Sequence, residues 1–344
     1  MTTFLLNQTG MNKKYIILLA IVFTAFSNPL LAQVTSVDAI GITVKEMDRS
    51  VKFYSEVLGF RKISDVELAG HEQEQLLGVF GLRMRVVRMQ LGDEFIELTD
   101  YLTSGGRSIP EDAKSNDLIF QHIAIVVSDM DRAYQQLRRF NVMHVSTNPQ
   151  TIPQSNIAAA GVKAFYFHDP DMHNLELIYF PKGKGLAKWQ NANKLFLGID
   201  HTAIGISNTD SSLKFYVALL GLERKGESWN MGMEQAHLNF VESASLHITG
   251  LRSSLGPGIE FLQYLVPGPG KPFPADSKSD DIWNWQTTLV VKAADPLYTR
   301  LNTAGYKLVS IQLVNLQNKA GLIAKAFIVR DPDGHALLIR ESFH

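Results

Sequence analysis

The chain has 344 residues, of which 45% are hydrophobic and 19% charged, so it is long enough for two globular domains. Its formal net charge of -1 gives no electrostatic basis for a nucleic-acid partner. It contains no cysteine, which excludes disulfides and thiolate metal ligands and leaves His, Asp, Glu and Gln as side chains for a metal.

The first 32 residues differ in character from the rest of the chain. Lys13 and Lys14 precede an apolar run at 15–26, and small or permissive residues follow as far as Ala32. This order is typical of a secretory signal peptide, and the run is too short to span a bilayer. We therefore expect residues 1–32 to be cleaved, the protein to be exported to the periplasm or secreted, and no stable membrane anchor to remain.

The segment after residue 32 predicts a strand and then a helix, and it occurs twice. In "VDAIGITVKEMDRSVKFYSEVLGF" at 37–60 an apolar run precedes Asp48, the expected N-cap, and helically spaced apolar residues end at Gly59. In "IDHTAIGISNTDSSLKFYVALLGL" at 199–222, Asp210 and Gly221 take the same places. The protein is therefore an internal duplication.

A second strand and helix recur within each half, and a nearly repeated stretch leads into both. The stretch is "IPEDAKSNDLIFQH" at 109–122 and "FPADSKSDDIWNWQ" at 273–286, so it ends once in His122 and once in Gln286. Strands separated by turns such as Asp-Pro-Asp at 169–171 and 331–333 close the units. The chain thus reads as four βαβββ units, which we group as domains 35–181 and 197–344 joined by a linker at 182–196.

These βαβββ units, with "DHTAIGIS", "SLKFYVALLGL" and the Asp-Pro-Asp hairpins, resemble the vicinal oxygen chelate superfamily of glyoxalases, bleomycin resistance proteins and extradiol dioxygenases. The resemblance covers nearly all of the chain after residue 32. It implies an α+β fold in which the four βαβββ modules pair into two curled-sheet cups, and a divalent metal ion held inside a cup. It is weak evidence for any one reaction, because this fold serves many chemistries.

The resemblance also implies where the metal ligands come from, namely the first and last strands of each unit. Carried over unit by unit, these positions are Ala39 and Glu97, His122 and Glu176, His201 and Glu260, and Gln286 and Leu338. Ala39 and Leu338 cannot bind a metal. The resemblance therefore implies a site of Glu97, His122 and Glu176 in the first half, and a second, weaker candidate site of His201, Glu260 and Gln286 in the second half.

The strand pattern supports a metal independently of the resemblance. Glu97 lies between Ile96 and Leu98, and because side chains alternate along a strand, its carboxylate points away from these apolar neighbours. Glu176 is flanked by leucines in the same way. A carboxylate enclosed by a curled sheet needs a positive partner. Nitrogen and oxygen ligands suit Zn, Mn, Ni, Co or Fe(II).

Other histidines and tryptophans have simpler explanations. His237 could contribute to the second site, but a single His in a strand more often packs or hydrogen-bonds. Turn hydrogen bonds account for the histidines beside the Asp-Pro-Asp turns, and core or interface packing accounts for the tryptophans. These residues are His168, His173 and His335, and Trp229, Trp283 and Trp285.

Three functions remain open at this point, all with a small-molecule ligand and a monomer or homodimer. The first is a glyoxalase-like lyase or isomerase, in which a metal polarises a carbonyl or enediolate oxygen and Glu176 or Glu97 moves a proton. The second is an extradiol-type ring-cleaving dioxygenase, which needs two His and one Glu on Fe(II) or Mn(II). The third is a non-catalytic, resistance-type binding protein.

Overall fold

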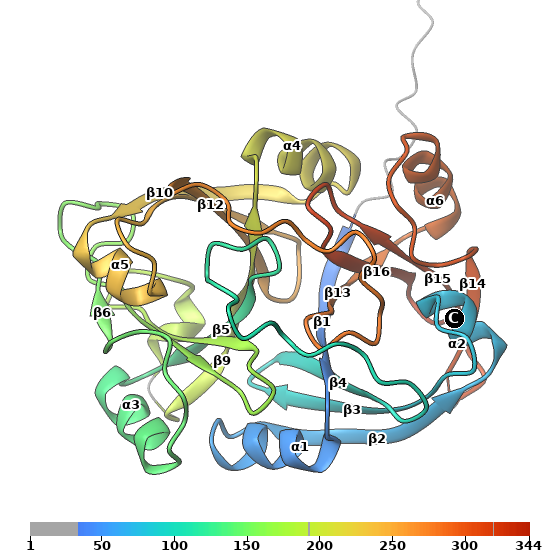
Figure 1. Cartoon of the computed structure of the whole chain (residues 1–344), viewed down its shortest axis with the longest axis horizontal. Helices are drawn as coiled ribbons and strands as arrows, with labels where there is room; N and C mark the ends of the chain where they lie inside the picture. Colours follow the sequence, from blue (N-terminus) through green and yellow to red (C-terminus); the bar gives the residue numbers. More distant parts are fainter. Residues whose placement is uncertain (1–33, 192, 319) are drawn as a thin grey trace, which may run out of the picture. The chain divides into compact units, whose positions relative to one another are not determined.

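The computed structural model describes residues 34–191, 193–318 and 320–344, which form two eight-stranded sheets with helices packed around them (Figure 1). The signal peptide expected at 1–32 lies outside the described residues. Within the described part, no helix is long and apolar enough to cross a membrane.

The first half of the chain contains two βαβββ units. The first unit consists of β1 (Val34–Val44), α1 (Met47–Glu56), β2 (Arg61–Ala69), a short α2 (His71–Leu77), β3 (Arg83–Leu91) and β4 (Glu94–Tyr101). The second consists of β5 (Gln121–Val127), α3 (Met130–Arg139), β6 (Gln150–Thr151), β7 (Lys163–His168) and β8 (Asn174–Tyr179), and a 3-10 turn, η1 (Ala187–Gln190), follows it.

The second half repeats this order. The third unit consists of β9 (Phe196–Ile206), α4 (Thr209–Leu213) continued by the π-helical η2 (Lys214–Leu219), β10 (Glu223–Met231), α5 (Met233–Asn239), β11 (Ser245–Arg252) and β12 (Gly258–Val266). The fourth consists of β13 (Trp285–Val291), α6 (Ala294–Thr303), β14 (Val314–Gln317), β15 (Ile323–Arg330) and β16 (Ala336–Glu341). His237, expected in a strand, lies in α5.

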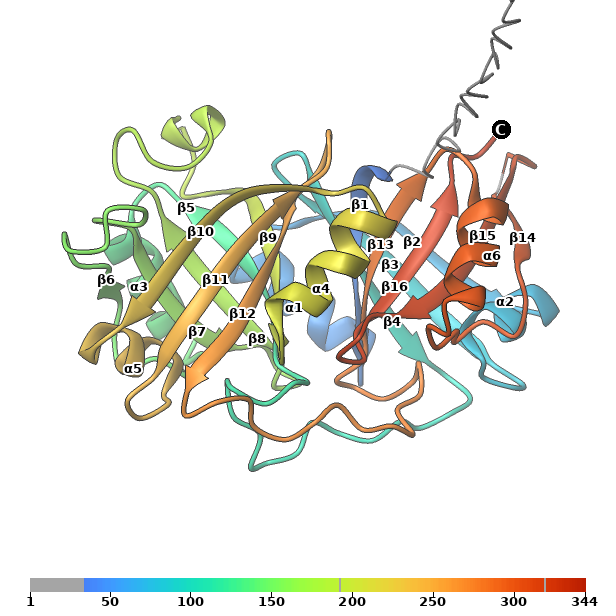
Figure 2. The ribbon, with the colours of Figure 1, turned by 90° about the horizontal axis from the view of Figure 1, so that it is seen from above.

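Each sheet combines one unit from each half of the chain. One sheet has the order β14-β15-β16-β13-β1-β4-β3-β2 and joins the fourth unit to the first; the other, β10-β11-β12-β9-β5-β8-β7-β6, joins the third to the second (Figure 2). Antiparallel pairs β1–β13 and β5–β9 form the seams. Two cups of paired units are confirmed, but the grouping of two units of one half into one cup is wrong. We call the sheets the first–fourth cup and the second–third cup.

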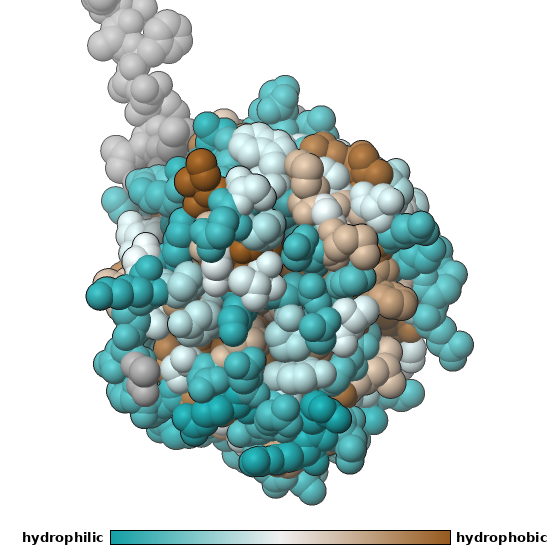
Figure 3. Space-filling model, turned by 90° about the vertical axis from the view of Figure 1, so that its left-hand side faces the viewer, coloured by the Kyte–Doolittle hydropathy of each residue, from teal (hydrophilic) through white to brown (hydrophobic). Residues whose placement is uncertain are grey.

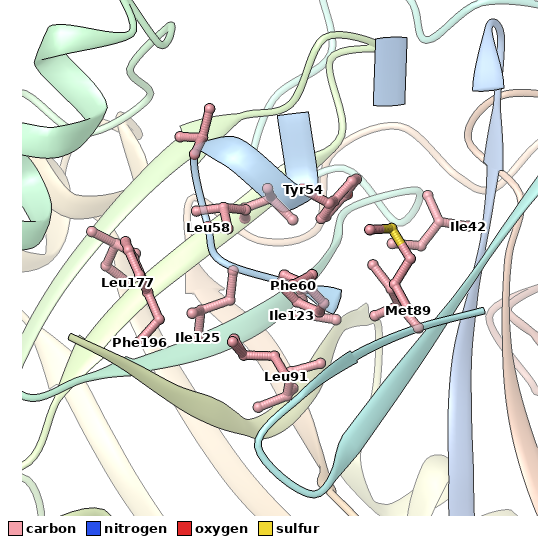
Figure 4. Close-up of a cluster of buried hydrophobic side chains, with 14 of the residues drawn as sticks. Ile42, Tyr54, Leu58, Phe60, Met89, Leu91, Ile123, Ile125, Leu177 and Phe196 are labelled. Carbon is pink, nitrogen blue, oxygen red and sulfur yellow. The ribbon is translucent and has the colours of Figure 1, made fainter. Parts of the chain in front are cut away.

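The two units of one half share a hydrophobic core rather than a sheet. One core packs β-strand and α1 residues of the first unit, such as Ile42 and Tyr54, against second-unit residues such as Ile123 and Leu177 (Figure 4). A second core does the same for the third and fourth units. Because one face of each sheet packs in a core and the other lines a cup, all seven residues of β5 are buried. Burial on both faces makes such strands read as continuous apolar runs, which carry no mark of the partner strand.

The helices begin and end close to the predicted positions. Glu46 and Asn208 cap α1 and α4 by accepting hydrogen bonds from backbone N–H groups, whereas Asp48 and Asp210, the expected caps, lie in the first turns. Gly59 and Gly221 follow the helices with φ of 76° and 79°, a left-handed conformation that favours glycine. The caps therefore come slightly earlier than the sequence suggested, because Glu and Asn serve where an Asp was expected.

The Asp-Pro-Asp turns explain two of the three histidines beside them. His173 Nδ1 lies 2.9 Å from Asp169 Oδ2, and the hydroxyl of Tyr54 donates to the same oxygen. His335, Asp331 and Tyr216 repeat the arrangement in the second half. Each tyrosine comes from the first helix of its half, so this bond also ties the two units of a half together. Turn hydrogen bonding is confirmed for His173 and His335.

The nearly repeated stretch forms a reciprocal clasp between the halves. Asp117 accepts a hydrogen bond from the backbone N–H of Lys271 (2.7 Å), and Asp281 accepts one from the backbone N–H of Arg107 (2.9 Å). Gly106 and Gly270 make room for it, since a Cβ on Gly106 would lie 1.8 Å from a backbone oxygen and one on Gly270 2.2 Å from Asp117 Oδ1. Each copy of the stretch thus holds the residues that lead into the other copy, immediately before a central strand of a cup.

The tryptophans divide between core and surface. Trp283 and Trp285 are buried, as packing predicted, whereas Trp229 is 52% exposed and stacks on His247. Figure 3 shows the face of the molecule that lies on the left in Figure 1, where α5, β6 and α3 are found. Hydrophilic residues cover most of this face, and apolar residues are scattered among them.

Candidate metal centre

Strand register brings four metal-ligating side chains together in the second–third cup. Across β8, β5 and β9, Glu176 pairs with Ala124, which pairs with His201. Across β5, β9 and β12, His122 pairs with Ala203, which pairs with Glu260. Residues directly opposite one another in a sheet point to the same face. The alanine between each His and Glu leaves the space in which these side chains meet.

The four side chains converge without satisfying one another. Glu176 Oε2 lies 3.1 Å from His122 Nε2 and 3.6 Å from His201 Nε2, and Glu260 Oε1 lies 3.5 Å from His201 Nε2. One atom from each of His122, Glu176 and His201 can be chosen so that all lie within 4.8 Å of one another. Yet neither His Nε2 has a hydrogen-bond partner among the described residues, although both are buried. Buried nitrogen and oxygen atoms that converge on one point without hydrogen-bonding one another are better explained as ligands of a shared cation.

A hydrogen-bonded carboxylate orients His201 from behind. Its Nδ1 lies 3.0 Å from Asp200 Oδ2, so Nε2 is the nitrogen that faces the cup. Asp200 in turn accepts hydrogen bonds from Trp189 Nε1 (2.7 Å) and from the Arg252 guanidinium (2.8 Å to each oxygen). A carboxylate behind a ligating histidine is a frequent feature of metal sites. Trp189 belongs to the segment expected as a linker, which is therefore part of the support of the site.

The carboxylates around His201 set its protonation. Burial by itself would lower the pKa of His201, but the negative charges of Glu260, Asp200 and Glu176 outweigh it and raise that pKa to about 9. Burial, together with the charge of Glu176, raises the pKa of Glu260 above its ordinary value. Asp200 is buried as well, yet the hydrogen bonds from His201 and Arg252 lower its pKa. The metal-free centre thus holds a proton on His201 that a metal ion would displace.

A cavity of 190 Å³ opens beside the centre and is partly polar. Glu176, His201 and Glu260 line it together with Tyr166 and Ile248. Ser228, Asn230 and Gln235 also line it, and Gln235, 2% exposed, has an Oε1 atom without a hydrogen-bond partner in the described part of the chain. An unpartnered buried acceptor on a cavity wall offers a hydrogen bond to a bound hydroxyl.

The structure regroups the residues expected from sequence. It places His122 and Glu176 with His201 and Glu260, and it places Glu97 and Gln286 in the first–fourth cup, where Gly41 lies between them in the register. The physical reason is the strand pairing across halves. Ala39 and Leu338, the positions that cannot bind a metal, fall together in that same cup, each opposite Thr288.

Sequence reasoning missed three residues that shape the site. Asp200, Trp189 and Gln235 come from the middle of β9, the expected linker and the short helix α5. Asp200 carried no usable signal, because neighbouring residues of a regular strand point to opposite faces. It reaches His201 because the β5–β9 register shifts at this residue, where Ala124 pairs with His201 and Ile125 pairs with Ile199. No pattern pointed to Trp189 or Gln235, since their roles arise from tertiary packing.

Comparison with known proteins shows the family of the chain. A sequence model described as "Glyoxalase/Bleomycin resistance protein/Dioxygenase superfamily" matches residues 36–177 and 198–339, which is most of the chain. The chain belongs to this superfamily. A relative from Actinomyces sp, named 2-epi-5-epi-valiolone epimerase, is 31% identical over 155 residues, which cover 43% of this chain and 81% of that protein.

Solved structures of the superfamily share the fold at low identity. Glyoxalase I from Zea mays is 14% identical with a TM-score of 0.59, covering 90% of this chain and 92% of that one. A putative dioxygenase from Bacillus subtilis subsp. subtilis str. 168 is also 14% identical, with a TM-score of 0.55 and coverage of 90% and 86%. The likeness in both cases is one of fold, and the site must be argued from its own residues.

Proposed function

We propose that this superfamily member is a metal-dependent isomerase or lyase that moves a proton on a carbon atom next to a carbonyl group of a small oxygenated molecule. The observation that carries the proposal is the convergence of His122, Glu176, His201 and Glu260 with unpartnered histidine nitrogens. Two imidazoles and two carboxylates suit Zn, Mn, Ni, Co or Fe(II).

A divalent ion at this position supplies polarisation of a carbonyl or enediolate oxygen. The chain's own residues supply the rest. Asp200 keeps His201 Nε2 directed into the cup, and Glu176 lies between the two histidines.

Glu260 is the carboxylate best placed to move the proton. Its side chain is 25% exposed, against 6% for Glu176, so it is the more accessible of the two. Its raised pKa brings it closer to neutrality, where a proton-transferring carboxylate works best. Glu176 or Glu97 was the base expected from sequence; Glu97 lies in the other cup, and Glu260 takes its place.

The polar wall of the cavity supports a hydroxylated substrate. Ser228, Asn230 and Gln235 are neutral hydrogen-bonding groups, and a volume of 190 Å³ suits a molecule smaller than most drugs. The relative from Actinomyces sp is named an epimerase, which favours an isomerase over a lyase. The signal-like segment at 1–32 supports action in the periplasm or outside the cell. Each cup is built within one chain, which suits a monomer as well as a homodimer.

The metal is the first part of the proposal to test. Elemental mass spectrometry on protein purified from its native compartment should find a metal that is lost in both His122→Ala and His201→Ala, because both residues serve one centre. Gln286→Ala, the position in the other cup that matches His122, is the control and should keep the metal. The proposal of a metal-dependent enzyme would be contradicted if both His variants retained the metal or if the reconstituted wild type bound none. The resistance-type binding protein would then be the better interpretation.

The proton transfer has its own measurement. A panel of small cyclic polyhydroxyketones serves as candidate substrates. In D₂O, the wild-type protein should exchange the hydrogen next to the carbonyl group of one of them, and NMR measures this exchange. Glu260→Gln, assayed with enough added metal to fill its weakened site, should lose the exchange by at least about a hundredfold. Exchange at the wild-type rate in Glu260→Gln would remove Glu260 from the mechanism.

An extradiol dioxygenase is the second candidate, and one observation favours it. His122, His201 and Glu176 form the two-histidine, one-carboxylate set that Fe(II) oxygenases use. The fourth donor, Glu260, favours the first proposal because it would fill a position that oxygen chemistry needs open. Oxygen uptake by the Fe(II)-loaded protein on addition of a catechol would reverse this preference.

A further inference from the structure

The first–fourth cup encloses a larger cavity that the metal chemistry does not use. Its volume is 610 Å³, against 190 Å³ beside the metal centre, and it lies over the face of the sheet that carries Glu97 and Gln286. The residues that line it belong to the first and fourth units, whereas the metal centre belongs to the second and third. A ligand in this cavity is therefore independent of the proposed function.

Arginine side chains take the place of a metal ion in this cup. Arg88 donates hydrogen bonds to Glu97 (2.6 Å) and to Asp38 (2.9 Å), and Arg340 donates one to Asp38 (2.8 Å). Burial opposes ionisation of Asp38, but the two guanidinium groups lower its pKa, and Asp38 and Glu97 raise that of Arg88 against the same effect. Two arginines face two carboxylates, so the cluster is formally neutral, which allows it to lie at a partly buried wall.

One acceptor on this wall lacks a partner. The Oε1 atom of Gln286 is buried and receives no hydrogen bond from the described residues, and Gln286 lines the cavity. Leaving such an atom unpaired costs free energy, so a hydroxyl group that donates to it would be bound favourably. The polar wall thus offers a free acceptor within a neutral surrounding.

The rest of the wall is largely apolar, and it is apolar at two positions where the wall of the other cup is polar. Val66 and Leu68 on β2 occupy the places that Ser228 and Asn230 occupy on β10, and both pairs line their cavities. Further apolar side chains of the wall include Leu76, Leu77, Met84, Val86, Leu316, Leu338 and Phe343. Neutral polar side chains lie among them, namely Ser64, Gln73, Thr99, Thr288, Gln317 and Asn318. A hydrocarbon body placed here would be removed from water on several sides.

We propose that the first–fourth cup is a metal-free binding site for an uncharged amphipathic small molecule. Its apolar body packs between β2, α2 and β16, and its hydroxyl group donates to Gln286 Oε1. A charged head group is disfavoured, because the four charges of the cluster are already paired and an added ion would have to break one of these pairs.

Two probes of the same ring size separate this proposal from general stickiness. 2-Naphthol carries a hydroxyl group that is neutral at pH 7, as phenols are, whereas 2-naphthoate carries a negative charge. Calorimetric titration should show one molecule of 2-naphthol bound per chain, with 2-naphthoate at least tenfold weaker. Removing metal with a chelator should leave both results unchanged.

Matched variants place the probe in one cup or the other. Val66→Trp fills the first–fourth cavity from an edge strand and should weaken 2-naphthol at least tenfold, while Ser228→Trp, at the matching position of the other cup, should not change it. Gln286→Leu should weaken it by about fivefold, the worth of one hydrogen bond. A wild-type circular dichroism spectrum and a cooperative urea transition show that Val66→Trp is folded; if it is not, Leu338→Phe fills the same cavity from β16.

The proposal is overturned by any of three results. These are no saturable binding of 2-naphthol to wild type, loss of binding in Ser228→Trp instead of the cavity-filling variants, and 2-naphthoate binding as tightly as 2-naphthol. Loss of metal in the variants of the second–third cup has no bearing on it, so failure here and failure of the proposed enzyme are distinguishable.

Discussion

The two cups share one strand order and one register, yet a few positions give them different chemistry. His201 and Glu176 in the second–third cup correspond to Ala39 and Leu338 in the first–fourth cup. Asp38 and Asp200 also correspond, but Asp200 orients a histidine whereas Asp38 binds two arginines. Once the histidine is missing, the carboxylates that remain need another cation, and Arg88 supplies it. The scaffold fixes where charge gathers, and the side chains decide whether a metal or a guanidinium balances it.

The largest expected difference is in the carboxylates of the two cups. Glu176→Gln and Glu260→Gln should each weaken metal binding by at least about a hundredfold, since each removes a charged ligand. Glu97→Gln, in the register position that matches Glu260, should change it less than twofold. Competition titration with a metal-binding dye measures the metal affinity of all three variants. A loss of affinity in Glu97→Gln would show that the two cups are not independent.

The residues behind the ligands should differ next most. Asp200→Asn should weaken metal binding by about ten- to a hundredfold, because His201 loses the charge that orients it and raises its basicity. Asp38→Asn should have no effect on the metal. Asp200 also raises the pKa of His201 and so strengthens the competition of the proton with the metal, which offsets part of the loss in Asp200→Asn at neutral pH. At pH 9.5 this competition is gone, so the loss in Asp200→Asn should be larger there, and equal affinities at pH 9.5 would show that Asp200 does not support the metal ligand.

The second–third cup should also respond to pH. The pKa of His201 is raised to about 9, so its proton stabilises the metal-free fold below the unfolded pKa of 6.5, and this contribution is lost as pH rises through about 9. Metal binding must release this proton, and affinity should therefore rise about tenfold per pH unit between pH 7 and 8 and level off above 9. Calorimetric titration of the metal in buffers of different ionisation enthalpy gives the number of protons released on binding, which should be close to one at pH 7. In contrast, 2-naphthol binding to the first–fourth cup should stay constant between pH 7 and 8, where its hydroxyl group remains neutral.

The smallest effect should fall on both cups equally. Gly106→Ala and Gly270→Ala put a Cβ against the clasp and should lower the free energy of unfolding by about 2 kcal/mol. Gly105→Ala, whose Cβ meets nothing within 4 Å, is the control and should change it by less than about 0.5 kcal/mol. Urea unfolding gives both values; equal stability of the three variants would show that the clasp contributes nothing.

The sequence predicted the fold well because its evidence was local and repeated. Strand and helix positions and the Asp-Pro-Asp turns follow from patterns within single units. The ligand positions His122, Glu176, His201 and Glu260 came from the resemblance to the superfamily, and their role in binding a metal stays a prediction. The grouping of ligands did not follow from the sequence, because β5 is buried along its whole length and would satisfy the same burial beside either unit. Residues such as Trp189 and Gln235 lie beyond any such pattern, since their contacts are made across the chain.

The crossing of the halves has a consequence for cutting the chain. A break in the segment at 182–196 leaves each fragment with its own core but with half of each cup, and it separates His122 and Glu176 from His201 and Glu260. The two fragments therefore suit complementation in trans. Neither would bind metal alone, and their reassociation, guided by the reciprocal bonds of Asp117 and Asp281, would restore both cups in one step.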